Sequence, residues 1–286
     1  MDEFTATMEA REFVRKTNPQ TIPVPMDAYL QQVGAQLRLD KSMGVDEAGC
    51  SFELSGKRYI SVNEKDRPER RRFTICHELA HIVLGLPSEH SAVPWWSYVK
   101  RSPNEIVCDV FATELLLPYP LFKPLVDKAE IGFAAIADLA KQFEASRTAT
   151  GSRFATLTQT PCAFVLSEQG KIRFSVCSRA LRDARAWIPR GVSLPGGSQA
   201  EKLRNGGIYQ GPEDIAADVW FDNWDRGGEL VEDARFFQPW DQTLSLIWFE
   251  DEEVPAPPRS IREQEEDVGL RELDGVLPWP GRRRRK

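Results

Sequence analysis

Three residues within one five-residue segment have the types and spacing needed for metal-assisted hydrolysis. His77 and His81 are four positions apart, and Glu78 directly follows His77. Because an α-helix turns once every 3.6 residues, side chains at i and i+4 lie on one face, so both imidazoles can reach one tetrahedral metal ion. Glu78 then lies beside them, where its carboxylate can deprotonate a water molecule activated by the metal. The segment therefore predicts a zinc site with a general base.

The flanking residues favour a helix here. Asp66 and Pro68 are typical of a helix cap and first turn, and Gly85 followed by Pro87 is typical of a helix end. The alternative is a core helix with two histidines in structural hydrogen bonds. However, the chain contains only 3 His, and two of them bracket a glutamate at the required spacing. One face should be buried, because apolar residues recur at helical spacing: Phe73, Cys76, Ala80, Val83 and Leu84.

A catalytic zinc site needs a third protein ligand and an open position. A helix over residues 104–118 would place Glu105 and Asp109 on one face, one turn apart. Glu105 could then supply the third ligand, while Asp109 accepts the outer N–H of a ligand histidine and fixes its tautomer. Glu114 is a competing candidate. It lies nine residues after Glu105, about two and a half turns, which predicts the opposite face.

The segments FTICHELAH and E-x-x-C-D-x-F-A-x-E-L-L-L-P together resemble the ImmA/IrrE family of bacterial metallopeptidases. The resemblance covers about residues 20–165. It implies that His77, His81 and Glu105 are zinc ligands and that Glu78 is the general base. By the same resemblance, Asp109 corresponds to the residue that accepts a hydrogen bond from a ligand histidine and so orients its ring.

The chain departs from the family pattern at two cysteines. Cys76 and Cys108 stand where the family usually has alanine, and neither change removes a metal ligand. Cys108 lies one helical turn from Glu105, so one interpretation is a redox response near the metal. The other is that both cysteines are small buried residues, as free cysteines often are.

A segment without clear periodicity, residues 86–103, separates the two site helices. It contains Tyr98 and His90, which are candidates for stabilising the oxyanion that forms during peptide hydrolysis. The alternative is an ordinary loop whose aromatic side chains pack on the core.

The fold class predicted for the chain is α+β. Residues 1–160 are expected to form a zincin-like helical peptidase domain with a small antiparallel sheet. Its predicted hairpin pairs residues 50–54 with 58–62. Helices are expected over residues 1–20, 27–39, 133–143 and 147–157. The last two could be mistaken for a DNA-reading unit that uses Arg147 and Arg153, but they have no strong basic face.

Residues 161–250 are expected to form a smaller β-rich or α+β domain. Predicted strands cover residues 163–166, 171–176, 219–221, 234–237 and 244–249. By the family resemblance, this domain would be a sensor. Its tryptophans either line a ligand pocket or fill the core, and core filling is the commoner role of large aromatic residues. They are Trp187, Trp220, Trp224, Trp240 and Trp248.

Composition narrows the class of protein. A net charge of −6 gives no general reason to expect direct nucleic-acid binding. The chain has no leader pattern and no long apolar run, so neither secretion nor a membrane span is expected. Its 5 cysteines are irregularly spaced, which favours a reducing cytoplasm. Residues 251–286 are charged and rich in proline, which predicts a disordered tail ending in a basic RRRRK sequence.

These observations predict a cytoplasmic zinc endopeptidase, with Mn²⁺ as an alternative metal. The resemblance implies that its substrate is a helix-turn-helix repressor, cut in a stress or mobile-element response. Residues 1–20 are too few to hold such a domain, so a separate partner protein is expected. Two alternatives stay open: a sensor that sequesters the repressor without turnover, and a toxin-like peptidase of a toxin-antitoxin pair. The sequence gives no oligomeric state.

Overall fold

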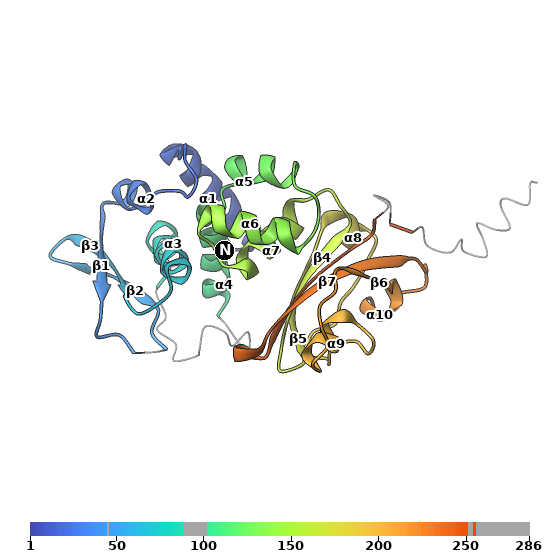
Figure 1. Ribbon diagram of the computed structural model, residues 1–286. Coiled ribbons are helices and arrows are strands. Elements are labelled where there is room, and N and C mark those ends of the chain that lie inside the picture. Colours follow the sequence, from blue (N-terminus) through green and yellow to red (C-terminus); the bar gives the residue numbers. More distant parts are fainter. Residues whose placement is uncertain (45, 88–101, 223, 251–253, 256–286) are drawn as a thin grey trace, which may run out of the picture.

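The computed structural model describes residues 1–44, 46–87, 102–222, 224–250 and 254–255. A helical region lies between a small three-stranded sheet and a larger five-stranded sheet (Figure 1), which confirms the α+β class. The helices are α1 (Glu3–Thr17), α2 (Met26–Val33), α3 (Pro68–Leu84), α4 (Pro103–Leu116), α5 (Tyr119–Val126), α6 (Phe133–Phe143), α7 (Arg147–Leu157), α8 (Arg179–Asp183), α9 (Gln199–Arg204) and α10 (Ala217–Trp220). The strands are β1 (Ala35–Asp40), β2 (Gly49–Leu54), β3 (Lys57–Asn63), β4 (Cys162–Glu168), β5 (Lys171–Cys177), β6 (Glu213–Ala216), β7 (Glu229–Phe237) and β8 (Gln242–Trp248).

The small sheet corrects one sequence prediction. The helix expected over residues 27–39 ends at Val33, because Gly34 adopts a left-handed conformation with φ 66° that ends the helix without steric cost. From Ala35 the chain continues as β1, which pairs in parallel with β3. The predicted hairpin of β2 and β3 is confirmed and is antiparallel. The sheet order is β1-β3-β2, so the sheet is mixed rather than purely antiparallel.

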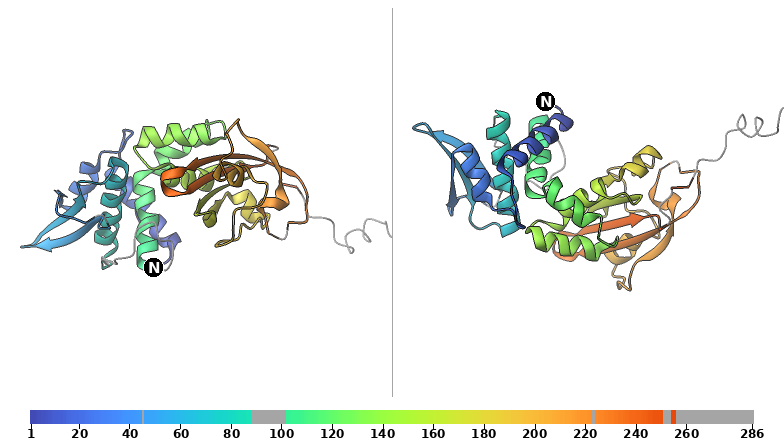
Figure 2. Two further views of the ribbon diagram at one scale, coloured as in Figure 1. Left: turned by 60° about the horizontal axis from the view of Figure 1, so that its bottom comes forward. Right: turned by 90° about the horizontal axis from the view of Figure 1, so that it is seen from above.

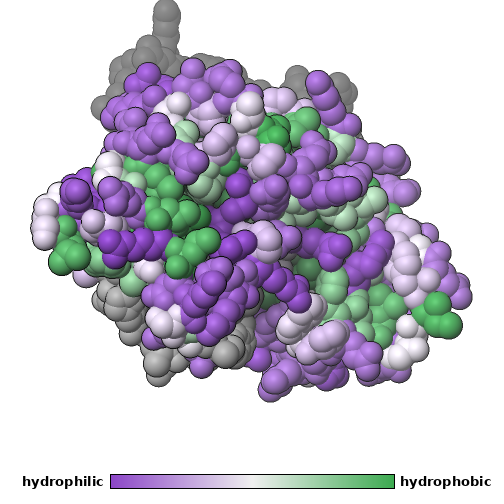
Figure 3. Space-filling view, turned by 60° about the vertical axis from the view of Figure 1, so that its left-hand side comes forward, coloured by the Kyte–Doolittle hydropathy of each residue, from purple (hydrophilic) through white to green (hydrophobic). Residues whose placement is uncertain are grey.

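One face of the small sheet packs on α3, and the other is covered by its own side chains. The Arg38 guanidinium lies 3.9 Å from the centre of the Tyr59 ring, and Phe52 stacks on the same ring at 5.4 Å. Figure 3 views the molecule from this side and shows apolar patches among charged residues. The exposed apolar side chains of β1 and β2 are Leu37, Leu39, Phe52 and Leu54.

Helix α3 begins and ends with different signals. Its N-cap is Arg67, without a side-chain cap, and Pro68 occupies the first turn. The predicted cap, Asp66, instead forms an ion pair with Arg70 at 3.1 Å. Gly85 ends the helix with φ 64°, as the sequence predicted. The buried side of α3 packs against α4 and against the small sheet, so the histidine segment faces another helix rather than solvent.

The five-stranded sheet has the order β5-β4-β8-β7-β6, and its neighbouring strands are antiparallel. The predicted hairpin of β4 and β5 is confirmed. The strand predicted over residues 219–221 is wrong, because residues 217–220 form the short helix α10. Its Trp220 is buried and donates its ring N–H to Glu232 of β7, a tertiary contact that overrides the strand preference of aromatic residues.

The two faces of this sheet have separate cores. Helix α7 packs on β4 and β5, while α9 packs on β7 and β8 (Figure 2). The core under α7 continues into the helical region and includes Phe111, Phe143 and Phe164. The core under α9 includes Trp220. The helical region and the sheet therefore share a core, and the domain division predicted near residue 160 stays a prediction.

Candidate metal centre

Three ligand-type atoms from two packed helices meet at one point. His77 Nε2 lies 3.1 Å from Glu105 Oε2 and 3.1 Å from His81 Nε2. His81 Nε2 lies 3.4 Å from Glu105 Oε1. The histidines come from successive turns of α3, and Glu105 comes from the first turn of α4. The structure thus brings together the three residues that the sequence singled out as ligands.

The spacing of these atoms fits a metal ion. A tetrahedral site with metal–ligand distances of about 2.0–2.1 Å has ligands about 3.3 Å apart. The three observed separations of 3.1, 3.1 and 3.4 Å match that spacing. Two imidazole nitrogens and a carboxylate oxygen are also a donor set that zinc accepts. The residues present therefore fit zinc.

The orientation of the His77 ring is set by a hydrogen bond on the side of the ring that faces away from the cluster. Its Nδ1 atom lies 3.0 Å from Asp109 Oδ1, so Nδ1 carries the proton and Nε2 keeps its lone pair toward the cluster. Within the described residues, the Nδ1 atom of His81 is buried without a hydrogen-bond partner. Asp109 is therefore the one outer acceptor that the described residues supply to the histidine pair.

Glu105 is held as a carboxylate. Burial by itself would raise the pKa of its carboxyl group, but the close polar contacts with the His77 and His81 rings outweigh burial and keep the pKa well below its usual range. Its backbone N–H donates to the side chain of Ser102, the N-cap of α4, at 3.4 Å. A negative charge in the first turn of a helix is also favoured by the helix dipole. Glu105 can therefore offer a charged oxygen to a cation.

Glu78 lies on the same helix but has a different partner. The residue is only 4% exposed, and Oε2 accepts a hydrogen bond of 2.8 Å from the hydroxyl of Ser51 on β2. Sequence reasoning missed Ser51. The pattern that could have indicated it is the alternation of side chains along residues 49–54. This alternation puts Ser51 and Cys50 on opposite faces of β2.

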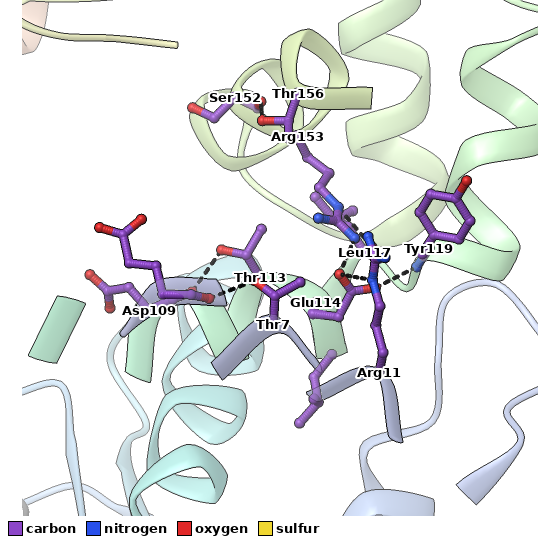
Figure 4. Close-up of polar contacts among 12 residues, drawn as sticks. Thr7, Arg11, Asp109, Thr113, Glu114, Leu117, Tyr119, Ser152, Arg153 and Thr156 are labelled. Atoms are coloured by element: carbon purple, nitrogen blue, oxygen red, sulfur yellow. Dashed lines mark hydrogen bonds and ion pairs between the residues drawn. The ribbon is translucent and has the colours of Figure 1, made fainter. Parts of the chain in front are cut away.

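Glu114, the competing ligand candidate, lies elsewhere. Its buried carboxylate accepts hydrogen bonds from Arg153 of α7 and from the backbone N–H of Tyr119, and Arg11 of α1 lies 3.4 Å away (Figure 4). Arg153 is itself buried, which excludes the DNA contact considered for it. Both residues belong to the packing of α1, α4 and α7.

The remaining candidates from the sequence are two predicted oxyanion-stabilising residues and two cysteines near the site. Tyr98 and His90 lie outside the described residues. Cys76 and Cys108 are completely buried, which confirms the packing interpretation. Burial raises the pKa of the Cys76 thiol to about 12. A thiol in this environment stays protonated at neutral pH and is a poor metal ligand.

The larger sheet carries an open cavity of about 390 Å³. Its wall includes Trp220, Trp224 and Pro195. Trp220 also belongs to the core under α9, and Trp248 is buried, whereas Trp187 and Trp240 are mainly exposed. The tryptophans thus fill the core only in part, and the ligand-binding role of this half stays a prediction.

Two histidines one turn apart, with a carboxylate from the next helix, define the HExxH class of metal-site proteins. Residues 31–154 match the peptidase family described as the IrrE N-terminal-like domain. Over this stretch, which is less than half of the chain, the sequence thus matches the ImmA/IrrE metallopeptidase family.

Two relatives carry the description "Radiation response metalloprotease IrrE". The protein from Deinococcus radiodurans is 35% identical over 107 residues, which are 36% of this chain and 31% of that protein. The protein from Deinococcus deserti is 29% identical over 135 residues, which are 43% of this chain and 48% of that protein. The matches thus span about a third to a half of the length of these curated relatives.

A solved structure extends the likeness in fold beyond the peptidase part. It is a Mycobacterium tuberculosis transcriptional regulator with a TM-score of 0.56 and 14% identity, and the match covers 87% of this chain and 77% of that one. At this identity the likeness concerns the fold alone. None of the helices in the described part of the chain combines the length and apolar character that crossing a bilayer requires.

Proposed function

We propose that this protein is a zinc-dependent endopeptidase. The triangle of donor atoms from His77, His81 and Glu105, with Glu78 on the same stretch of α3, carries the proposal. Zinc held by these three residues would lower the pKa of a bound water molecule to about 7 and polarise the carbonyl of the scissile bond. Mn²⁺ is the alternative metal.

The other side chains of the site have separate roles in proton transfer and in holding the ligands. Glu78 takes the proton from the attacking water and returns it to the leaving amine, as a general base and then a general acid. Asp109 accepts a hydrogen bond from His77 Nδ1–H, which would keep the Nε2 lone pair of His77 directed at the metal. Glu105 contributes negative charge and does not transfer protons.

An extended peptide is the substrate that suits the surroundings of the site. Among the described residues, β2 pairs only with β3, so its other edge offers backbone groups to a peptide strand. The same strand lies against α3 and holds Ser51 at Glu78. A peptide on this edge would run beside the general base.

The substrate that we propose is a helix-turn-helix repressor in the cytoplasm, cut in response to stress. Support comes from the family and from the two Deinococcus relatives, whose description names a radiation response. The rival is a protein that holds the repressor without cutting it. Intact Glu78 favours hydrolysis, because a purely structural zinc site needs no general base.

Mass spectrometry of a helix-turn-helix repressor encoded beside this protein's gene tests the proposal. The repressor is incubated with the zinc- or manganese-loaded protein and, in parallel, with Glu78→Gln. A single cut made only by the unaltered protein is expected, while both proteins keep equal metal content. Binding without cutting by both proteins would support sequestration. Cutting of many unrelated proteins would support the toxin-like alternative.

A further inference from the structure

The general base is tied to a strand that is distant in sequence. Ser51 Oγ donates to Glu78 Oε2 at 2.8 Å across 27 positions of the chain. Ser51 is half-buried and Glu78 is buried, so this hydrogen bond is largely shielded from water. A hydrogen bond to an ionised carboxylate is stronger than one between neutral groups, and shielding strengthens it further.

The contact belongs to a regular match between β2 and α3. Gly49 and Ser51 are two positions apart and lie on one face of the strand, while Thr74 and Glu78 are one turn apart on the helix. A Cβ atom at Gly49 would lie 2.6 Å from Thr74 Cγ2, so only glycine allows this close approach. Gly49 therefore meets Thr74 in the same way that Ser51 meets Glu78, and the strand is close enough for a short hydroxyl side chain to reach the carboxylate.

We propose that Ser51 is a positioning residue for Glu78, an inference that rests on the proposed peptidase function. The terminal torsion of a glutamate is broad, so packing alone fixes its carboxylate poorly. Ser51 engages Oε2 and thereby directs the other oxygen, Oε1, to the water and its proton. The hydroxyl group of Ser51 contacts Glu78 rather than the three candidate metal ligands, so its side chain acts through Glu78.

Acetohydroxamic acid tests this role without any cleavage assay. A hydroxamate binds zinc through its two oxygens, and its hydroxyl proton is accepted by a neighbouring base. Its affinity therefore reports whether the Glu78 carboxylate is correctly aimed. Isothermal titration calorimetry would measure acetohydroxamic acid and zinc separately on the full chain, for the wild type, Ser51→Ala, Ser51→Thr and a Cys50→Ala control on the opposite face of β2.

We expect Ser51→Ala to bind acetohydroxamic acid about fivefold to tenfold more weakly, with unchanged zinc affinity. Ser51→Thr, which keeps the hydroxyl group, should restore the affinity, and Cys50→Ala should match the wild type. If Ser51→Ala does not fold, Ser51→Cys fills the same space with a much weaker donor and should show the same loss.

Wild-type affinity for acetohydroxamic acid in both Ser51→Ala and Ser51→Cys would overturn the proposal. A parallel loss of zinc affinity in these variants would also overturn it, because the contact would then hold the site together rather than aim Glu78. Failure of the wild type to bind zinc would be a different result, since it would remove the peptidase proposal itself.

Discussion

Arg153 Nη2 donates to Glu114 Oε2 at 2.5 Å, although 39 positions of sequence separate the two residues. Both side chains are almost completely buried, and Glu114 also accepts the backbone N–H of Tyr119. The pair joins α7 to α4 on the side of α4 that faces away from Glu105. Carboxylates of one helix thus have different tasks, because Glu114 stabilises the packing whereas Glu105 belongs to the candidate metal centre.

Glu114→Gln should destabilise the fold without removing the metal. The substitution leaves the buried Arg153 guanidinium without its ionic partner, a change that typically costs about 3–5 kcal/mol. Urea unfolding of the metal-free protein would measure the loss, and atomic emission spectroscopy would measure zinc per chain. Loss of zinc from a variant that is still folded would contradict the packing role.

Glu105→Gln should have the opposite profile. The amide keeps the size of the side chain but removes the charged oxygen that lies 3.1 Å from His77 Nε2. Zinc affinity should fall by more than the 10–100-fold typical of an outer-shell partner, while urea unfolding without metal changes little. Competition with a zinc-binding dye gives the affinity. Equal zinc affinity in Glu105→Gln and Glu114→Gln would show that the ligand set is wrong.

Asp109→Asn should weaken zinc binding by about 10–100-fold. Asparagine can present its N–H₂ group to His77 Nδ1, which favours the tautomer whose Nε2 carries a proton and cannot bind metal. The same dye competition measures the effect. Thr113→Ser, one turn further along α4, is a matched control because it keeps the hydroxyl that donates to the Asp109 carbonyl. Wild-type affinity in Asp109→Asn would remove Asp109 from the site.

Thiol labelling of the native protein should follow burial. Burial raises the pKa of Cys76 to about 12 and that of Cys177 to about 11, and it also raises that of Cys162. Because only the thiolate reacts, labelling at pH 8 should be slow and should accelerate as the pH rises. Iodoacetamide followed by peptide mass spectrometry should find Cys50 modified first, because it is the most exposed of these thiols. Early labelling of Cys108 would contradict the buried site helix.

Gly151→Ala should loosen the contact between α7 and the larger sheet. A Cβ atom at Gly151 would lie 2.3 Å from the ring of Phe164 on β4, so the substitution overpacks the core, at a typical cost of about 1–3 kcal/mol. Phe164→Leu in the same chain should recover part of this loss. Urea unfolding of both single variants and the double variant gives the coupling. If the losses in unfolding free energy of the two single variants simply add in the double variant, Gly151 and Phe164 are not in energetically coupled contact.

Elements whose signals lie within a few neighbouring residues could be predicted from the residue pattern. Helical spacing placed His77, Glu78 and His81 on α3, and the same reasoning put Glu105 and Asp109 on one face of α4 with Glu114 opposite. These relationships follow from the geometry of one helix, which is fixed over a few residues. The two hairpins were likewise predictable from alternation and turn residues.

Which elements contact one another depends on packing across the whole chain. Residues 35–39, which were predicted to be helical, lie in strand β1 and pair with β3. Residues 217–220 form a helix, and Trp220 there donates a hydrogen bond to the buried Glu232. The partners Ser51 for Glu78 and Arg153 for Glu114 are equally non-local. Local periodicity cannot specify such pairs, because each depends on how segments 12 to 39 positions apart pack in the whole chain.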